Sequence, residues 1–330
     1  MDCQLDCNRQ FAAALNQCPC YDECPNGCDA CANDICDNKK LRVLVLNSSY
    51  GSQFLLRPYE PAEANQVDFN YESDTEAYFS CGATYRGKSL VFGGVKQTRQ
   101  ISQVTSCGLV RIGNLRNDFS RGSCAAVDGG DYVALCFSKG TKTCLLWRDD
   151  EYALPEAQFK HDYTSIAVVN RTIVAVGDSS GTTAETLDLL SFPFGEDQLQ
   201  WQLKAEFPYS TTYKNYATVG KDGAAYYFGG YNGAGMMNII TRFDLNTWST
   251  IGELNKPRDF HSVALVGGRF LVVGGESYEK TLSWRVNLFF RGRETEFCHL
   301  HKGTIDCIDQ SPTLQDNYKP VLLMVDADMC

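Results

Sequence analysis

Apolar residues recur along most of this chain in pairs of short runs joined by tight turns. The clearest copy is RDFHSVALVGGRFLVVGG at 258–275, in which the apolar runs 263–266 and 270–273 flank Gly267-Gly268. Two glycines between two strand-like runs predict a β-hairpin, because glycine reaches the positive φ values of a primed turn. A second pair, Gly274-Gly275, predicts the end of the second strand.

The same hairpin pattern predicts internal repeats. Related segments occupy 76–94, 118–138, 161–178, 212–230 and 258–275. Their second strands end near residues 94, 137, 177, 230 and 275, so the steps between copies are 43, 40, 53 and 45 residues. Periods of this size are typical of propellers and related arrays. A third apolar run and often an aromatic fourth run follow each hairpin, which predicts four strands per repeat.

Two incomplete copies stand at the ends of the repeated region. Residues 315–330 match only the first strand of the hairpin, and residues 40–49 look like the missing second strand. We therefore expect the C-terminal segment to pair beside the N-terminal one. That pairing closes a ring of six blades, five whole and one composite. Closure removes the exposed sheet edges that make open sheets prone to aggregation.

The repeat resembles the kelch family of β-propellers over roughly residues 41–330. Its best motifs are Phe92-Gly93-Gly94, Phe228-Gly229-Gly230 and Val273-Gly274-Gly275, whereas 136–138 and 176–178 depart from the double glycine. The resemblance implies an all-β fold, a six-bladed kelch-like β-propeller closed by the C-terminal strand. Copper-radical oxidases share a kelch-like propeller. Their tyrosine-cysteine cofactor and their histidine ligands from an additional domain have no recognisable counterpart in this sequence.

Half of the 16 cysteines fall within the first 36 residues. This density predicts a cysteine-rich disulfide module at 1–40, before a propeller at 41–330, and an oxidising extracellular setting. A zinc or copper knot is the alternative, because Cys28-x2-Cys31 has ligand-like spacing. The start Met1-Asp2-Cys3 carries no signal peptide, so we expect that a signal was removed or that the sequence is truncated.

Cysteines in the repeats suggest local disulfides. The candidate pairs are Cys136–Cys144, Cys298–Cys307 and Cys81–Cys107. Each of the first two flanks a short loop and is expected to clamp a hairpin. The third is expected to tie the first strand of a blade to its outer part. Cys124 and Cys330 have no assigned partner.

Charge and hydropathy exclude two kinds of partner. The net charge of -10 and the isoelectric point near 5.0 oppose binding to nucleic-acid phosphates and anionic lipid surfaces. No apolar run approaches the roughly 20 residues that span a bilayer, so we expect no membrane insertion. With 44% hydrophobic residues, the chain is large enough to bury a sizeable core.

Candidate catalytic and metal-binding residues are few. His161 and His261 lead into first strands, where a polar side chain usually satisfies turn backbone. His299-x-His301 places two rings on one face of a strand, but one pair is too few for a metal site. The segment 177–181 matches G-x-S-x-G without the strand-turn-helix context of a nucleophile elbow. Acidic runs such as 149–151 are expected to be solvated. The sequence therefore predicts no metal, no cofactor and no enzymatic activity.

The expected function is binding. Loops after the second strands should converge on one rim of the ring and form the contact face. Its candidate residues are Lys96, Gln97, Ser179, Ser180, Tyr231, Asn232, Ser277 and Tyr278. Sequons at Asn47 and Asn170 predict glycosylation. We expect a secreted protein that binds an extracellular protein or a glycan. The alternatives are a propeller-based extracellular oxidase or hydrolase and an intracellular kelch adaptor.

Overall fold

The computed structural model describes residues 41–46, 53–56, 64–66, 79–105, 108–177, 181–190, 192, 199–209, 216–278, 289–291, 295–310 and 320–326. The predicted cysteine-rich module therefore lies outside the described residues. So do several residues singled out from the sequence, namely Cys28, Cys31, Asn47, Cys107, Ser179, Ser180 and Cys330. No helix in the described ranges is long and apolar enough to cross a membrane.

The described chain is all-β, apart from the 3-10 turns η1 (Asp128–Gly130) and η2 (Ser138–Gly140). Four sheets have four strands each. The first has the spatial order β27 (Val321–Asp326), β1 (Leu41–Leu46), β2 (Gln53–Leu56) and β3 (Ala64–Gln66). The second consists of β4 (Cys81–Tyr85), β5 (Lys88–Phe92), β6 (Gln100–Thr105) and β7 (Gly108–Asn114), and the third of β8 (Ser123–Val127), β9 (Tyr132–Cys136), β10 (Cys144–Arg148) and β11 (Asp150–Ala153). The fourth consists of β12 (Ile166–Val169), β13 (Thr172–Val176), β14 (Ala184–Asp188) and β15 (Trp201–Lys204).

The remaining strands form two further sheets. One has eight strands in the order β16 (Ala217–Lys221), β17 (Ala224–Phe228), β18 (Ile239–Phe243), β19 (Trp248–Glu253), β26 (Thr304–Gln310), β25 (Thr295–His301), β22 (Arg269–Val273) and β21 (Ser262–Val266). A single parallel pair, Gly252 with Ile305, joins its two halves. Each half has the four-stranded antiparallel pattern of the other sheets, and we refer to each half as a sheet of its own. The other has three short strands, β20 (Arg258–Asp259), β23 (Glu276–Tyr278) and β24 (Phe289–Arg291).

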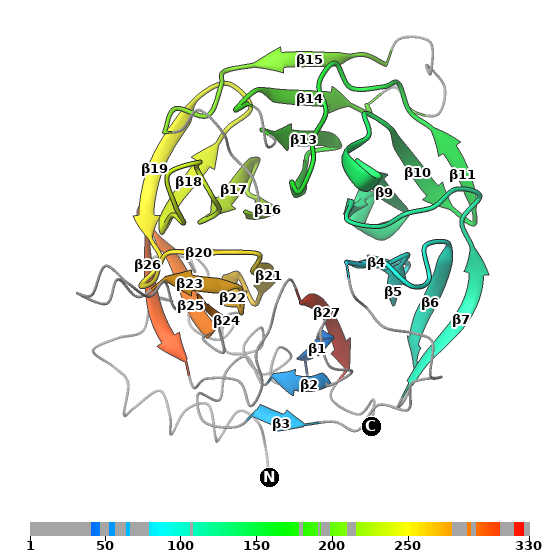
Figure 1. Ribbon diagram of the computed structural model, residues 1–330, viewed down its shortest axis with the longest axis horizontal. Coiled ribbons are helices and arrows are strands. Elements are labelled where there is room, and N and C mark those ends of the chain that lie inside the picture. Colours follow the sequence, from blue (N-terminus) through cyan, green and yellow to red (C-terminus); the bar gives the residue numbers. More distant parts are fainter. Residues whose placement is uncertain are drawn as a thin grey trace, which may run out of the picture.

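The sheets form a ring, and the fold is a β-propeller. Figure 1 shows β4, β16, β21 and β27 near the centre and β3, β7, β11 and β15 at the periphery. Hydrophobic clusters lie between neighbouring sheets. For example, Ala225 and Tyr227 of β17 pack with Val174 and Val176 of β13. The core is therefore divided among the contacts between sheets.

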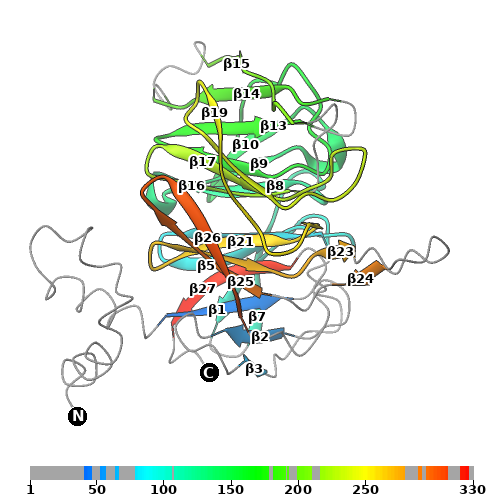
Figure 2. The same ribbon diagram turned by 90° about the vertical axis from the view of Figure 1, so that its left-hand side faces the viewer.

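The C-terminal strand closes the ring. All six residues of β27 pair antiparallel with β1, the pairing that the sequence predicts, and the two strands lie side by side in Figures 1 and 2. On either side, β27 contacts the innermost strands β21 and β4. Val43 and Val45 of β1 complete the closure by packing against β22. The first and last strands of the propeller thus belong to one sheet.

The burial of each strand explains the apolar runs in the sequence. All five residues of β9 and of β17 are buried, because second strands are covered on both faces by neighbouring sheets. The outer strand β7 has only one buried residue, Leu109. Between β21 and β22, Gly267 and Gly268 have φ values of 52° and 75°, as the primed hairpin turn requires. The prediction for this hairpin is confirmed.

Three disulfides occur among the described residues. Cys136–Cys144 joins paired positions of β9 and β10, and Cys298–Cys307 joins paired positions of β25 and β26. These are the two hairpin pairs predicted from the sequence. The third, Cys81–Cys124, links the innermost strands of two adjacent sheets, 43 residues apart.

The predicted Cys81–Cys107 pair is wrong, because Cys81 is bonded to Cys124. Cys81 begins β4, and β5 separates β4 from β6 in this sheet. Two strand spacings amount to roughly 10 Å, which exceeds the Cα separation that a disulfide spans. The sequence prediction kept both cysteines in one blade, whereas Cys81 bonds to a cysteine of the adjacent sheet.

Candidate functional site: the axial cavity and its mouth

A cavity of about 450 Å³ occupies the centre of the ring. It is lined by residues of the innermost strands β4, β8, β12, β16, β21 and β27 and of the segments leading into them. Each of these strands contacts the next one around the ring. The wall includes serine and threonine side chains, the Cys81–Cys124 disulfide and small residues such as Gly82 and Ala83. Its size is in the range of small-molecule sites.

Aromatic side chains and one arginine gather at the mouth, where the chain enters the innermost strands. The Tyr163 ring lies 6.5 Å from that of Phe79 and 6.2 Å from that of Phe260, with edge-on geometry in both pairs. The guanidinium carbon of Arg121 lies 5.2 Å from the Phe79 centroid and 5.8 Å from the Tyr163 centroid. Arg121 Nη1 also donates a 3.1 Å hydrogen bond to the Tyr163 hydroxyl. We call these four residues the mouth cluster.

The mouth cluster converges over the ring axis. Phe79, Tyr163 and Phe260 lead into β4, β12 and β21, and no two of these strands belong to neighbouring sheets. Their rings can meet only by projecting inward over the cavity. Tyr163 and Phe260 line the cavity directly, and both are half-buried.

All four backbones of the mouth cluster are left-handed. The φ values are 55° for Phe79, 57° for Arg121, 57° for Tyr163 and 51° for Phe260. Such a conformation costs a non-glycine residue about 1–3 kcal/mol and is common at ligand sites. The same strained position recurs in four sheets. Because the left-handed conformation is repeated around the ring, it directs four large side chains toward one point, which a relaxed backbone at these positions would not do.

Two titratable side chains near the mouth lie between sheets. His261 and Tyr216 hold the same place in their repeats, one residue before the innermost strand. The Tyr216 hydroxyl donates to the Val176 and Ser165 carbonyls, and burial raises the pKa of Tyr216. Cε1 of His261 would lie 3.1 Å from a Cβ at Gly229, at the end of the neighbouring β17.

The imidazole of His261 stays neutral. Burial, followed by the charge of Arg258, lowers the pKa of His261 to about 3, and the Phe228 backbone acts in the opposite direction. Neither ring nitrogen makes a well-aligned hydrogen bond with a described residue. The His261 imidazole therefore packs between two sheets, at the position that Tyr216 occupies in its own repeat.

A second pair of equivalent residues ties the loops to the sheets. His161 Nδ1 lies 2.9 Å from the Gly177 carbonyl, and Nε2 lies 2.9 Å from Glu185 of β14. In the last sheet, Arg258 donates to the Gly274 carbonyl at 3.0 Å and pairs with Glu296 of β25. Both acidic side chains are fully buried.

Backbone amides also donate hydrogen bonds to each of these carboxylates. Glu185 accepts from the amides of Gln158 and Phe159, and Glu296 accepts from that of Asn255. The polar contacts named here for His161, Glu185, Arg258 and Glu296 hold the segments before β12 and β21 against the sheets. These four residues have a structural role.

The contact residues predicted from the sequence lie beside the cavity rather than in it. Lys96 and Gln97 stand between β5 and β6, and Tyr231 and Asn232 stand between β17 and β18; none of them lines the cavity. Asn232 Oδ1 accepts from the amides of Ala234 and Gly235. For Ser277 and Tyr278 the structure describes only the backbone of β23.

These loops do border the mouth. The Gly94 amide donates to the Phe119 carbonyl, and the Gly230 amide donates to the Arg258 carbonyl. Each bond joins the turn after a second strand to a segment that leads into an innermost strand. The sequence prediction named these loops on one rim of the ring and did not include the mouth cluster. The available signal was a bulky residue repeated just before the first strand in four of the five copies.

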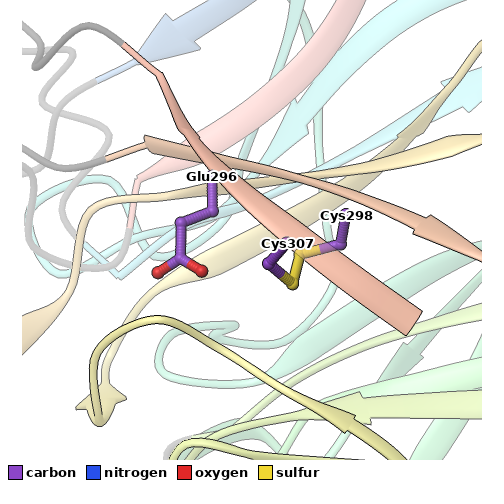
Figure 3. A group of neighbouring side chains, drawn as sticks. All are labelled: Glu296, Cys298 and Cys307. Atoms are coloured by element: carbon purple, nitrogen blue, oxygen red, sulfur yellow. A yellow bond between two sulfur atoms is a disulfide. The ribbon is translucent and has the colours of Figure 1, made fainter. Parts of the chain in front are cut away.

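One group of metal-binding side chains meets among the described residues, and it does not fit a metal ion. Glu296, Cys298 and Cys307 have ligand atoms within 4.8 Å of one another. Figure 3 shows the two sulfur atoms joined in a disulfide, with the carboxylate beside them. Because a cysteine binds a metal as a thiolate, the sulfur atoms of this disulfide supply no ligand. His299 and His301 lie 6.5 Å apart between ring centroids and have no third donor of this kind near them in the described ranges.

Comparisons with known proteins support the fold. The sequence matches no protein-family profile and no curated protein. The solved structure of YjhT has a TM-score of 0.64 at 10% identity, over 82% of this chain and 95% of that one. A novel fungal alcohol oxidase of the AA5 family, in complex with copper, has a TM-score of 0.56 at 12% identity. That match covers 84% of this chain and 66% of the oxidase.

The oxidase overturns the expectation that this protein is not an enzyme. A chain with the same type of fold is an alcohol oxidase, so a propeller of this kind is no ground for excluding catalysis. Copper itself does not fit the described residues. His261 is the one histidine of the described cavity wall, and its ring lies between two sheets.

Proposed function

We propose that this protein is a secreted, six-bladed propeller of kelch type that binds the terminal sugar of an extracellular glycan in its axial cavity. The blade count is supported by the four-stranded pattern of the sheets and by the contacts of the innermost strands around one axis. The double glycines after β5, β17 and β22, all with positive φ, support the kelch type.

The observation that carries the ligand site is the convergence of aromatic rings on the mouth of the cavity. Tyr163 and Phe260 offer apolar faces against which a sugar ring can lie, and hydroxyl groups such as Ser165 and Thr218 line the wall. Small-molecule sites combine apolar surface with a few placed polar groups in this way. The loops with Lys96 and Tyr231 are then positioned to contact the rest of the glycan.

Replacing Tyr163 with alanine should weaken sugar binding at least about tenfold, since it removes an aromatic contact from the centre of the site. The test is ligand-observed NMR with glucose, galactose, mannose, N-acetylglucosamine and glucuronate. Tyr152→Ala, on the outer strand β11, is the matched control, because it removes an exposed tyrosine far from the axis. If none of the five sugars binds the unmodified protein, the sugar site does not exist.

An extracellular oxidase or hydrolase is the second candidate function, favoured by the likeness to the alcohol oxidase. It would place turnover of the bound sugar in the same cavity. Assays for hydrogen peroxide release and for glycoside hydrolysis, with and without added copper, together with metal analysis of the purified protein, decide this point. Turnover above the level of a Tyr163→Ala variant would support an enzyme.

Secretion is supported by the three disulfides found in the described ranges and by an exposed sequon. Asn170 is exposed in the turn between β12 and β13, and the sequon ends at Thr172, the first residue of β13. Intact mass should rise on reduction and alkylation and should fall on treatment with an N-glycosidase when the protein comes from a eukaryotic secretory host. Sixteen free thiols would contradict the extracellular assignment.

A further inference from the structure

Arg121 is the one cation of the mouth cluster, and it is exposed. Its backbone amide donates a 3.1 Å hydrogen bond to the Phe79 carbonyl. The guanidinium is held against the Phe79 and Tyr163 rings and by the Tyr163 hydroxyl. Contact with two aromatic faces restricts the side chain in advance of any ligand, and guanidinium groups suit such stacking.

No carboxylate in the described ranges lies within 4 Å of the Arg121 guanidinium. The acidic residue nearest in sequence is Asp118, which pairs instead with Arg99 at 2.9 Å and with Lys139 at 3.6 Å. Arg116 pairs with Asp150. In a chain of net charge -10, a preorganised arginine that has no acidic partner among the described residues is available to an anion.

The position of Arg121 places an anion bound to it at the axial cavity. Arg121 precedes Gly122 and Ser123, which line the cavity, and it bonds to Tyr163, which lines the mouth. A ligand whose ring lies against Tyr163 therefore brings its substituents within reach of the guanidinium. The planar group can bind a carboxylate or a sulfate through two parallel N–H···O bonds.

We propose that Arg121 selects sugars that carry an anionic substituent, so that the natural ligand is an acidic glycan bearing a uronate or a sulfate ester. This inference rests on the proposed sugar site and adds that the site prefers negatively charged sugars. The anionic group binds the guanidinium, and the sugar ring lies against the Tyr163 and Phe260 rings.

The test compares glucuronate and glucose 6-sulfate with neutral glucose by calorimetric titration of the full chain. We expect at least one anionic sugar to bind about tenfold or more tightly than glucose, because charge-assisted hydrogen bonds are stronger than neutral ones. Arg121→Gln should abolish this preference, so that its affinities for the anionic sugars fall to that for glucose, and Arg121→Lys should retain part of it. The preference should also weaken as sodium chloride is added.

Arg111→Gln is the matched control. It removes an exposed arginine of the outer strand β7, and its affinities should equal those of the unmodified protein. The relative response to glucuronate and glucose 6-sulfate decides between a uronate and a sulfate. Equal affinity for all three sugars, or an anionic preference that survives in Arg121→Gln, overturns the inference while leaving the sugar site in place. Absence of binding by all three overturns both.

Discussion

Replacing Arg258 with methionine should lower the free energy of unfolding by about 3–5 kcal/mol, because it leaves the Glu296 carboxylate buried without its cation. The Arg258 side chain is 1% exposed and that of Glu296 is fully buried. Arg258 also donates to the Gly274 carbonyl, so the variant loses a bond between β20 and the turn after β22 as well. Urea unfolding of the unmodified and variant proteins measures the difference.

The pH dependence of the Arg258→Met variant identifies the cause. Burial raises the pKa of Glu296, and the charge of Arg258 opposes that effect. Without Arg258 the pKa should rise further above its unfolded value. The folded variant then holds a proton that the unfolded chain releases, so its stability is retained at low pH and lost as pH rises. The destabilisation should therefore be smaller at pH 4 than at pH 7.

A double substitution provides the control. Arg258→Met with Glu296→Leu removes both charges and should recover much of the stability lost in the single variant. Equal unfolding midpoints for Arg258→Met and the unmodified protein would show that the pair contributes nothing. A double variant as unstable as the single one would assign the loss to packing or to the Gly274 bond rather than to the buried carboxylate.

The repeat made much of the fold predictable. Gly267-Gly268 located a hairpin, its copies located the others, and the incomplete copy at 315–330 predicted the pairing of β27 with β1. These inferences worked because both features can be recognised locally in the sequence. Positive φ appears as glycine pairs, and strands buried on both faces appear as apolar runs. Arg258 and His161 occupy the same place in their copies, yet only the structure shows that each meets a buried carboxylate.

The mouth cluster was not predictable, because it depends on ring closure. Phe79, Tyr163 and Phe260 are between 84 and 181 residues apart in sequence, and they meet only when the sheets surround one axis. The Cys81–Cys124 disulfide was missed for the same reason, since it joins adjacent sheets and not adjacent strands of one sheet. Contacts within a repeat can be inferred from spacing, whereas contacts between repeats require the geometry of the whole ring.

Placing a charge on the closing strand should open the ring. Leu323 of β27 is 3% exposed and packs in the cluster that joins this sheet to β5 and β6. Its side chain lies against Gly82 of β4, where an added Cβ would be only 2.8 Å from Leu323 Cδ2. Leu323→Asp would bury an unpaired carboxylate in that contact, which costs several kcal/mol.

The Leu323→Asp variant is expected to lose cooperative unfolding or to unfold at a much lower urea concentration. Neighbouring backbone groups should be released with it, since Ser89 donates to the Met324 carbonyl and Ser262 to the Pro320 carbonyl. Unpairing of β27 also exposes the edge of β1, so light scattering should detect association. Leu203→Asp is the matched control, because Leu203 is 53% exposed on the outer strand β15 and its replacement should change stability by less than about 0.5 kcal/mol. A monomeric Leu323→Asp protein with an unchanged midpoint would mean that β27 does not hold the ring closed.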